Sequence, residues 1–158
     1  LWMRENLESM KDFEPVTGSI QFTTFLSVLE RTIRGGNRFS LLSVELLNLD
    51  TYNKKMGHEF TNRLLQKVFQ VIRHCVGTRA FISRKGGGHF FVLLKDRGSM
   101  EAANVLKILN YTVSKNMPEE ITVHQKGMTE MGIAHFPEDG KNLWDLFERA
   151  KNRKILSS

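Results

Sequence analysis

A run of three glycines followed by a histidine constrains this chain more than any other segment. The run consists of Gly86, Gly87, Gly88, His89 and Phe90. It lies between two short apolar stretches, residues 80–83 and 91–94, which is the layout of a β-hairpin closed by a glycine-rich turn. Glycine allows the backbone to adopt positive φ or to come very close to another group. A metal site at such a turn needs a carboxylate, so this segment resembles an active-site turn from which the acid is missing.

The composition is that of one globular domain with a hydrophobic core. The chain has 158 residues, of which 41% are hydrophobic and 25% are charged. No apolar run approaches the roughly 18 residues that a membrane span requires, and no signal-peptide pattern is present. The single cysteine, Cys75, excludes an internal disulfide and fits a reducing compartment. We therefore expect a cytoplasmic domain without membrane contact, in which Cys75 is a buried structural thiol.

The formal net charge of +6 raises the question of nucleic-acid binding. The basic residues are scattered, apart from a cluster on the predicted last helix that consists of Arg149, Lys151, Arg153 and Lys154. No aromatic side chains alternate with these basic residues, as they do in proteins that stack bases. A solvated helix face explains the cluster better, and nucleic acid is not the partner that the sequence favours.

The apolar periodicity predicts an alternation of helices and strands. Helical patterns cover residues 1–13, 22–33, 50–56, 60–75, 102–113 and 143–150, and strand patterns cover 39–47, 121–124 and 129–136 besides the hairpin. Glycine- and proline-containing turns separate these segments. The order of elements predicts one α+β domain, in which a central and mainly antiparallel sheet is flanked by helices.

Five landmarks follow one another at the spacings of one known family. The matching segments are 14–18 (D-x-L-T-G), 39–45 (the first strand), Asn53 with Gly57 and His58 (N-D-x-x-G-H), 84–90 (R-x-G-G-[DE]-E-F), and 131–134 with 137–140 (S-I-G-I-A, then P-x-D-G). The chain thus resembles, over nearly its whole length, a degenerate form of the GGDEF domain of bacterial diguanylate cyclases.

The resemblance implies a fold and a domain organisation. The family fold is the nucleotide-cyclase palm, a ferredoxin-like arrangement of a sheet and flanking helices. The resemblance places a GGDEF domain at residues 14–158, ending before the family's last motif, and a helical linker from an upstream domain at residues 1–13. We expect the chain to be part of a larger signalling protein.

The acids that the family uses for chemistry are mostly missing. Joining two GTP molecules requires divalent cations, and Mg²⁺ prefers carboxylate oxygens. The resemblance places one metal ligand at Gly88 and the next catalytic acid at His89, whose neutral imidazole is a poor ligand for Mg²⁺. The aligned acid of the first strand is present as Glu45, but Leu47 replaces the second acid of that strand's D-x-D pattern. We therefore predict no catalytic residues and no metal site. Glu45 has two open interpretations, a relic metal ligand or a solvated or lysine-paired strand end.

The positions that bind the nucleotide in the family have also changed. Asn53 occupies the place of the asparagine that reads guanine, and Asn62 replaces the aspartate. An amide offers one acceptor oxygen where a carboxylate offers two, so it matches the adjacent N–H donors of guanine less well. His58 matches the family, whereas Asp50 stands in place of a phosphate-binding lysine and repels phosphate. The candidates for nucleotide binding are Asn53, His58 and Asn62, and helix capping is the alternative role for these side chains.

The inhibitory product site of many family members is also missing. Its R-x-x-D pattern aligns with Gly77 and Ala80. The sequence therefore argues against feedback by the product as well as against its synthesis.

These observations lead to competing hypotheses about function. The first is a catalytically inactive GGDEF domain without a cofactor, which serves as a regulatory or protein-interaction module in cyclic dimeric GMP signalling. Its partners would be other domains of the same protein or another signalling protein, and a homodimer is compatible with the sequence. The alternative is an allosteric sensor that binds GTP and Mg²⁺ without turnover. A residual cyclase and a nucleic-acid-binding module rank below these two.

Overall fold

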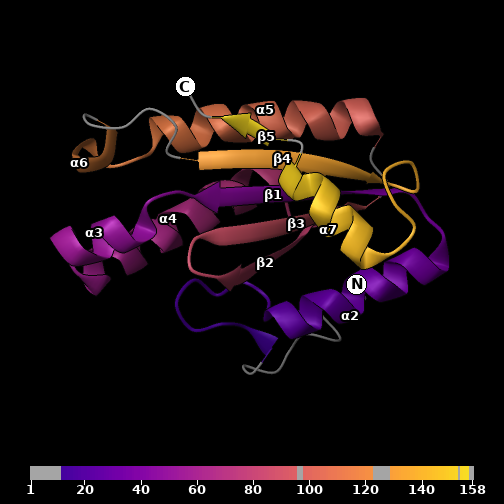
Figure 1. The fold of residues 1–158 in the computed structure, drawn as a ribbon, viewed down its shortest axis with the longest axis horizontal. Helices are drawn as coiled ribbons and strands as arrows, with labels where there is room; N and C mark the ends of the chain where they lie inside the picture. The colour runs from indigo at the N-terminus through magenta and orange to yellow at the C-terminus, as the bar shows by residue number, and fades with distance from the viewer. Residues whose placement is uncertain (1–11, 96–97, 123–128, 153, 157–158) are drawn as a thin grey trace.

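The computed structural model describes residues 12–95, 98–122, 129–152 and 154–156. Within this part of the chain, five strands form one antiparallel sheet in the order β2-β3-β1-β4-β5. The strands are β1 (Phe39–Leu46), β2 (Phe81–Gly86), β3 (His89–Lys95), β4 (Thr129–Phe136) and β5 (Lys154–Leu156). Helices cover both faces of this sheet (Figure 1). The predicted α+β fold is therefore confirmed.

The helices also match the predicted pattern in most places. They are α2 (Phe22–Gly35), α3 (Leu49–Met56), α4 (His58–Val76), α5 (Ser99–Lys115), α6 (Glu119–Thr122) and α7 (Leu143–Asn152). Helix α2 ends where expected, because Gly36 adopts the left-handed conformation with φ +77° and its N–H donates to the carbonyl of Ile33. No helix among the described residues is both long enough and apolar enough to cross a membrane.

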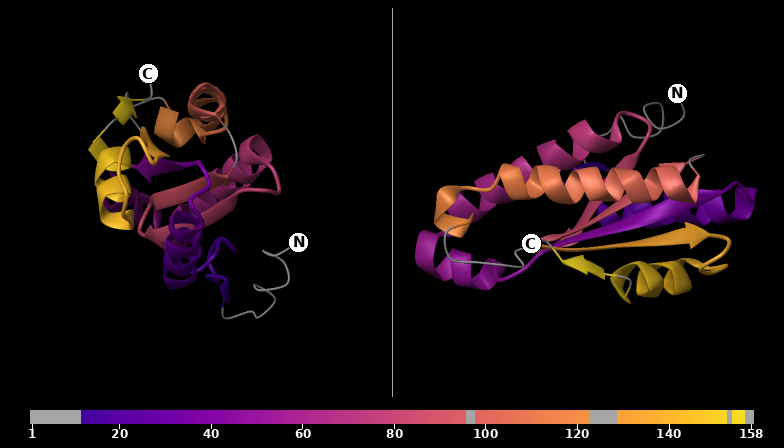
Figure 2. Two further views of the ribbon diagram at one scale, coloured as in Figure 1. Left: turned by 90° about the vertical axis from the view of Figure 1, so that its right-hand side faces the viewer. Right: turned by 90° about the horizontal axis from the view of Figure 1, so that it is seen from above.

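The central strand β1 is apolar on both faces, and each face belongs to its own core. Phe39 and Leu41 pack with α2 and α7, on what we call the α2/α7 side of the sheet. Leu42, Val44 and Leu46 pack with α4 and α5, on the α4/α5 side. The two further views in Figure 2 show the helices separated by the sheet in this way. Alternating side chains of one strand thus anchor both layers of helices.

The strand predicted at 121–124 is wrong where the structure describes it. Ile121 belongs to the short helix α6, and its N–H donates to the carbonyl of Pro118 at 3.0 Å. Pro118 immediately precedes this helix, and Glu119 and Glu120 occupy its first turn, where negative charge is favourable. The buried Ile121 side chain packs against the α4/α5 core from this helix. Residues 123 and 124 lie outside the described residues.

Both ends of the chain depart from the predicted pattern or lie outside the description. Lys154 is part of β5, which pairs with β4, so it does not extend the last helix. The unpaired edge of β4 would otherwise expose backbone donors and acceptors, and β5 satisfies some of them. The predicted helix at 1–13 lies outside the described residues as far as residue 11, and Phe13 forms an antiparallel bridge with Ile20.

Candidate functional site

The glycine-rich segment forms the tight turn between β2 and β3, as the sequence predicts. Gly86 pairs with His89, so Gly87 and Gly88 are the two residues of the turn. Gly86 and Gly87 have φ of +152° and +52°, values that residues with a side chain rarely adopt. A β-bulge at Lys85 shifts the register just before the turn. The turn lies at the same end of the sheet as α3 (Figure 1).

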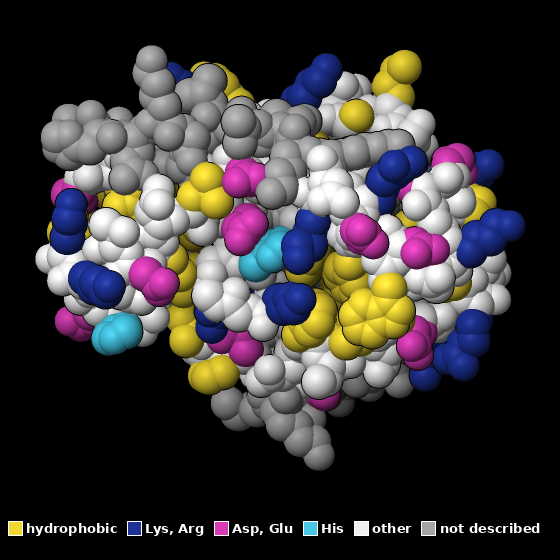
Figure 3. All heavy atoms as spheres, viewed as in Figure 1, with side chains coloured by type: hydrophobic (Ala, Val, Ile, Leu, Met, Phe, Trp, Pro, Cys, Tyr) yellow, Lys and Arg dark blue, Asp and Glu magenta, His cyan; other side chains and the backbone are white. Residues whose placement is uncertain are grey.

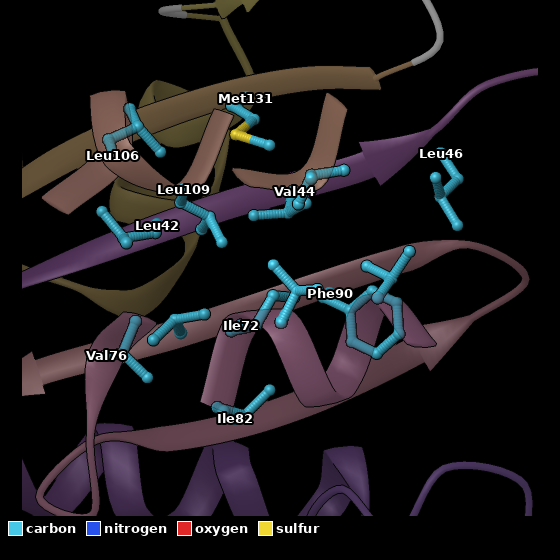
Figure 4. Packing of buried hydrophobic residues seen from close by; sticks show 14 of the residues in the cluster. Leu42, Val44, Leu46, Ile72, Val76, Ile82, Phe90, Leu106, Leu109 and Met131 are labelled. Atoms are coloured by element: carbon cyan, nitrogen blue, oxygen red, sulfur yellow. The ribbon is translucent and has the colours of Figure 1, made fainter. Parts of the chain in front are cut away.

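Gly88, the position at which the family carries an acid, is buried against the end of β1. The N–H of Leu46 donates to the Gly88 carbonyl at 2.9 Å. A Cβ atom added to Gly88 would lie 2.8 Å from the Cβ of Leu46 and 3.2 Å from its carbonyl oxygen. Figure 4 shows Leu46 at the end of β1, beyond Val44. Leu46 and Phe90 belong to the same hydrophobic cluster. Strand β1 therefore occupies the space that a side chain at position 88 would need.

Glu45 lies in a row of polar side chains across the three central strands. It is level with His89 on β3 and with Glu130 on β4, so the three side chains share the α2/α7 side. The face drawn in Figure 3 shows acidic, histidine and basic side chains gathered near its centre, beside an apolar patch over α7. Glu130 was missed by the sequence reasoning. The family landmark at Gly132 could have revealed it. Gly132 pairs with Ser43, so Glu130, two residues earlier on the antiparallel strand, pairs with Glu45.

His89 makes contacts that suit a structural residue. Its Nε2 shares a hydrogen bond with Ser43 Oγ at 2.7 Å, and its ring lies 4.3 Å from the ring of Phe91. Both contacts tie the start of β3 to the α2/α7 core. The ring is thereby held against the sheet.

The donor set present does not fit the divalent cations that the family uses. Gly88 offers no side-chain oxygen, and Leu47 follows β1 where the family has a second acid. Glu45 and Glu130 are two carboxylates on neighbouring strands, but Glu130 lies on the side of β1 away from the hairpin. Among the described residues, no group of three or more His, Cys, Asp or Glu side chains is arranged to hold a metal ion.

The nucleotide-binding candidates lie on the neighbouring helices α3 and α4. His58 and Asn62 are exposed on α4. Asn53 on α3 is different, because its amide oxygen is buried and has no hydrogen-bond partner among the described residues. The neighbouring Tyr52 hydroxyl is also buried without a partner, and burial raises the pKa of this phenol. A role for Asn53, His58 and Asn62 in nucleotide binding stays a prediction.

A cavity of about 420 Å³ lies beside α4. It is lined by Met56, Phe60, Arg63, Leu64, Lys67, Pro118 and Glu120. Successive residues of a helix are about 100° apart, so the α4 residues of this lining lie on a different side of the helix from Asn62. None of Asn53, His58 and Asn62 lines this cavity.

An ion pair between Glu14 and Arg84, which the sequence reasoning did not assign, anchors the hairpin. Glu14 is buried, and its carboxylate accepts hydrogen bonds from the Val16 and Thr17 N–H groups, each at 2.8 Å, and from the Thr17 hydroxyl. Arg84 donates to the same carboxylate through Nη2 at 3.1 Å and through Nε at 3.2 Å. The Nη1 of Arg84 also donates to the carbonyl of Gly87 at 2.8 Å. One guanidinium thus joins the turn at 14–18 to the glycine turn.

These contacts change the acidity of Glu14. Burial alone raises the pKa of its carboxyl, but the hydrogen bonds from Arg84, Thr17 and the backbone of Val16 and Thr17 lower it more. The net result is a pKa lowered from the usual 4.5 to about 2. The matching landmarks at both ends of this contact, 14–18 and 84–90, are the signal that could have revealed the pair.

Comparison with known proteins assigns the family. Residues 20–154 match the family described as diguanylate cyclase, GGDEF domain. The chain is 30% identical over 123 residues, 77% of its length, to the bifunctional diguanylate cyclase/cyclic di-GMP phosphodiesterase MucR of Pseudomonas aeruginosa. It is 23% identical over 132 residues, 84% of its length, to the cyclic di-GMP phosphodiesterase PdeB of Shewanella oneidensis. This chain therefore belongs to the GGDEF domain family.

Solved structures of the family share the fold. The GGDEF domain of FimX from Pseudomonas aeruginosa matches with a TM-score of 0.79 at 20% identity, covering 90% of each chain. The GGDEF domain of DgcB from Caulobacter crescentus, in complex with c-di-GMP, matches with a TM-score of 0.75 at 20% identity, covering 90% of this chain and 86% of the other. The chain spans less than a fifth of the length of the curated relatives it matches, 18% of MucR and 15% of PdeB.

The Glu14–Arg84 pair predicts a loss of stability in acid. Because the folded-state pKa of Glu14 is lowered from 4.5 to about 2, its contribution is present above pH 4.5 and is lost as the pH falls towards 2. We expect Glu14→Gln to lower the free energy of unfolding on the order of 2 kcal/mol at neutral pH, and by less at low pH. Urea denaturation from pH 7 to pH 3 measures this difference.

The matched control is Glu138→Gln, which removes the exposed ion pair between Arg38 and Glu138. An exposed pair contributes little, so this variant should change the free energy of unfolding by less than about 1 kcal/mol at every pH. Equal effects of the two variants would contradict the anchoring role of Glu14.

The contact between Gly88 and Leu46 predicts that even a methyl group is harmful at position 88. We expect Gly88→Ala to lower the free energy of unfolding by about 1–3 kcal/mol, because the new Cβ overlaps a buried strand end. Gly35→Ala is the control, since a Cβ there has nothing within 4 Å. Chemical denaturation should show the control unchanged or stabilised by up to about 1 kcal/mol, and equal stability of the two variants would refute the steric argument.

Proposed function

We propose that this GGDEF domain is catalytically silent and acts as a regulatory or protein-interaction module in cyclic dimeric GMP signalling. The observation that carries this proposal is the packing of Gly88 against Leu46, with 2.8 Å between the Leu46 Cβ and the position of a Cβ at Gly88. At this position the resemblance calls for a carboxylate that binds a cation. Here there is neither a side chain nor room for one.

The chemistry of the reaction explains why this position matters. A 3′ hydroxyl must attack an α-phosphate, and divalent cations neutralise the phosphates and help to activate the hydroxyl. The hairpin contributes no carboxylate to hold them, and Leu47 removes another. Asp50, exposed in the first turn of α3, adds a negative charge where the family binds phosphate.

The relatives support a role inside a larger protein. MucR is described as a bifunctional diguanylate cyclase and cyclic di-GMP phosphodiesterase, and PdeB as a cyclic di-GMP phosphodiesterase. Both are several times longer than this chain. A silent GGDEF domain in such a protein would act on a neighbouring domain or a signalling partner through its surface, as a rigid and correctly folded body.

The proposal predicts no synthesis of cyclic dimeric GMP. Purified chain incubated with GTP and either Mg²⁺ or Mn²⁺ should give no product above the buffer blank by chromatography with mass detection, while an active family member run in parallel gives product. Turnover by this chain would overturn the proposal. If turnover occurs and Glu130→Gln abolishes it, Glu45 and Glu130 act together as unusual ligands and the domain is a residual cyclase.

Restoring the signature tests the steric part of the argument separately. The double variant Gly88→Glu, His89→Glu carries both missing acids, but its residue 88 still meets Leu46 and it still has Leu47 and Asp50. We expect it to remain inactive in the same assay. Activity of a folded double variant would show that the missing acids alone silence the domain and that β1 does not block them.

A GTP sensor without turnover is the second candidate, and the buried, unpartnered amide oxygen of Asn53 favours it. A buried polar atom without a partner is costly, and a donor from guanine would satisfy it. Under this alternative, calorimetry with GTP and Mg²⁺ should detect binding that Asn53→Ala weakens at least about tenfold, the equivalent of one hydrogen bond of about 1.4 kcal/mol. Asn104→Ala, an exposed amide on α5, is the control, and a null titration up to millimolar nucleotide would exclude the sensor.

A further inference from the structure

Helix α5 carries an unusual number of exposed apolar side chains. Six large apolar residues are exposed among those the structure describes, and three of them lie on this helix. The three are Met100, Ile108 and Tyr111, with exposed fractions of 79%, 58% and 65%. The opposite face of α5 packs into the α4/α5 core, where its buried residues are Ala102, Leu106, Leu109 and Val113. Helix α5 is therefore apolar on two faces, whereas a surface helix normally has one apolar face.

The exposed side chains form one stripe. With about 100° per residue, Met100, Tyr111 and Ile108 fall within about 80° of each other around the helix. The right-hand view of Figure 2 shows α5 lying across the front of the molecule, with no other described helix or strand in front of it. Asn104, which is also exposed, lies within this arc between Met100 and Ile108. Large exposed apolar side chains gathered on one helix face are typical of a surface that another protein covers.

Three exposed charged residues of α5 border the stripe. The two at its ends, Glu101 and Lys115, are opposite in sign, and Lys107 lies near its middle. Glu101 and Lys115 lie seven residues before and after Ile108, which places all three on the same side of the helix. The Nζ of Lys115 is 5.5 Å from the centre of the Tyr111 ring, so this ammonium group lies within the stripe. When two such helices lie antiparallel, the acidic end of each meets the basic end of the other. A parallel arrangement would bring like charges together.

We propose that the outer face of α5, defined by Met100, Glu101, Ile108, Tyr111 and Lys115, binds the same face of a second copy of this chain. The two helices run antiparallel around a two-fold axis near Ile108. A two-fold interface uses the same patch on both copies, and the order acid–apolar–base along one helix fits this symmetry. Glu101 of each copy then lies near Lys115 of the other, about 10 Å from the axis on either side.

The size and charge of this surface define a weak dimer. One helix face per copy is smaller than the interfaces of permanent dimers. Each copy also carries a formal charge of +6, and the two copies repel each other. Salt screens this repulsion over about 8 Å at physiological ionic strength and strengthens apolar contacts. We expect dimerisation in the high micromolar range that becomes tighter as salt is added.

Sedimentation velocity of the 158-residue chain over a wide concentration range tests the proposal. The sedimentation coefficient should rise with concentration for the wild type. Ile108→Glu and Tyr111→Glu should each weaken association at least tenfold, because they place like charges next to the axis. Trp144→Glu is the matched control, since Trp144 is 68% exposed but belongs to α7 on the opposite side of the sheet, and it should associate like the wild type.

A charge exchange tests the antiparallel arrangement. Glu101→Lys and Lys115→Glu should each weaken the dimer, because each places like charges opposite one another. The double variant with both exchanges should restore association to within about threefold of the wild type. Thermal unfolding should confirm that all variants are folded, which is expected because every substituted side chain is exposed.

The proposal is overturned by a wild type that stays monomeric up to millimolar concentration. It is also overturned if Ile108→Glu and Tyr111→Glu associate as strongly as the wild type, since the dimer then uses another surface. Failure of the double exchange to restore association would refute the antiparallel pairing of Glu101 with Lys115.

Discussion

Strand β1 holds the two halves of the core together, because side chains on both of its faces are buried. Leu41 packs under α2 and α7, while Leu42 and Val44 pack under α4 and α5. Since β1 pairs with β3 on one edge and with β4 on the other, its register also decides which residues of those strands are level with each other. The placement of Glu45 opposite His89 and Glu130 is thus a consequence of core packing. A one-residue slip of either pairing would move every side chain of the shifted strand to the opposite face and disrupt the packing of both cores.

The contacts that hold the glycine turn do not depend on the chemistry of the family. Arg84 joins Glu14 to the carbonyl of Gly87, and Ser43 holds the ring of His89. The first set of contacts lies within landmarks that this chain retains, and the second involves a histidine where the family has an acid. The turn is therefore held in place by contacts that need no bound cation. Under the proposed function, such contacts would keep the domain folded without its catalytic chemistry.

The fold could be predicted from the sequence to the extent that local signals and core packing agree. Strand β1, helices α2 and α4, and the glycine hairpin all follow from apolar periodicity and from turn residues. Residue 121 was misassigned because a short apolar run fits a buried strand and a buried helix equally well, and Pro118 with its two following glutamates decided between them. Strand β5 has no periodicity of its own, and only the open edge of β4 explains it.

The candidate site was less predictable, because its properties arise between strands. The missing acids at Gly88 and Leu47 can be read from the sequence against the family. The distance from Gly88 to Leu46, the level of Glu130 with Glu45, and the buried oxygen of Asn53 depend on register and packing, which one sequence does not show. The role of Glu14 required the contact with Arg84, which is 70 residues away along the chain.

The packing of Gly88 also bears on the proposal that this domain is catalytically silent. A site that holds several carboxylates close together for cations is unfavourable when those cations are absent, since like charges repel and buried charges are desolvated. Glycine at this position removes one such charge and lets the end of β1 close against the turn, with Leu46 donating to the Gly88 carbonyl. Active sites commonly reduce stability, and replacing their residues often raises it. In this domain the glycine packs directly against β1, so an acidic side chain at position 88 would have to displace a buried strand end as well as add a charge.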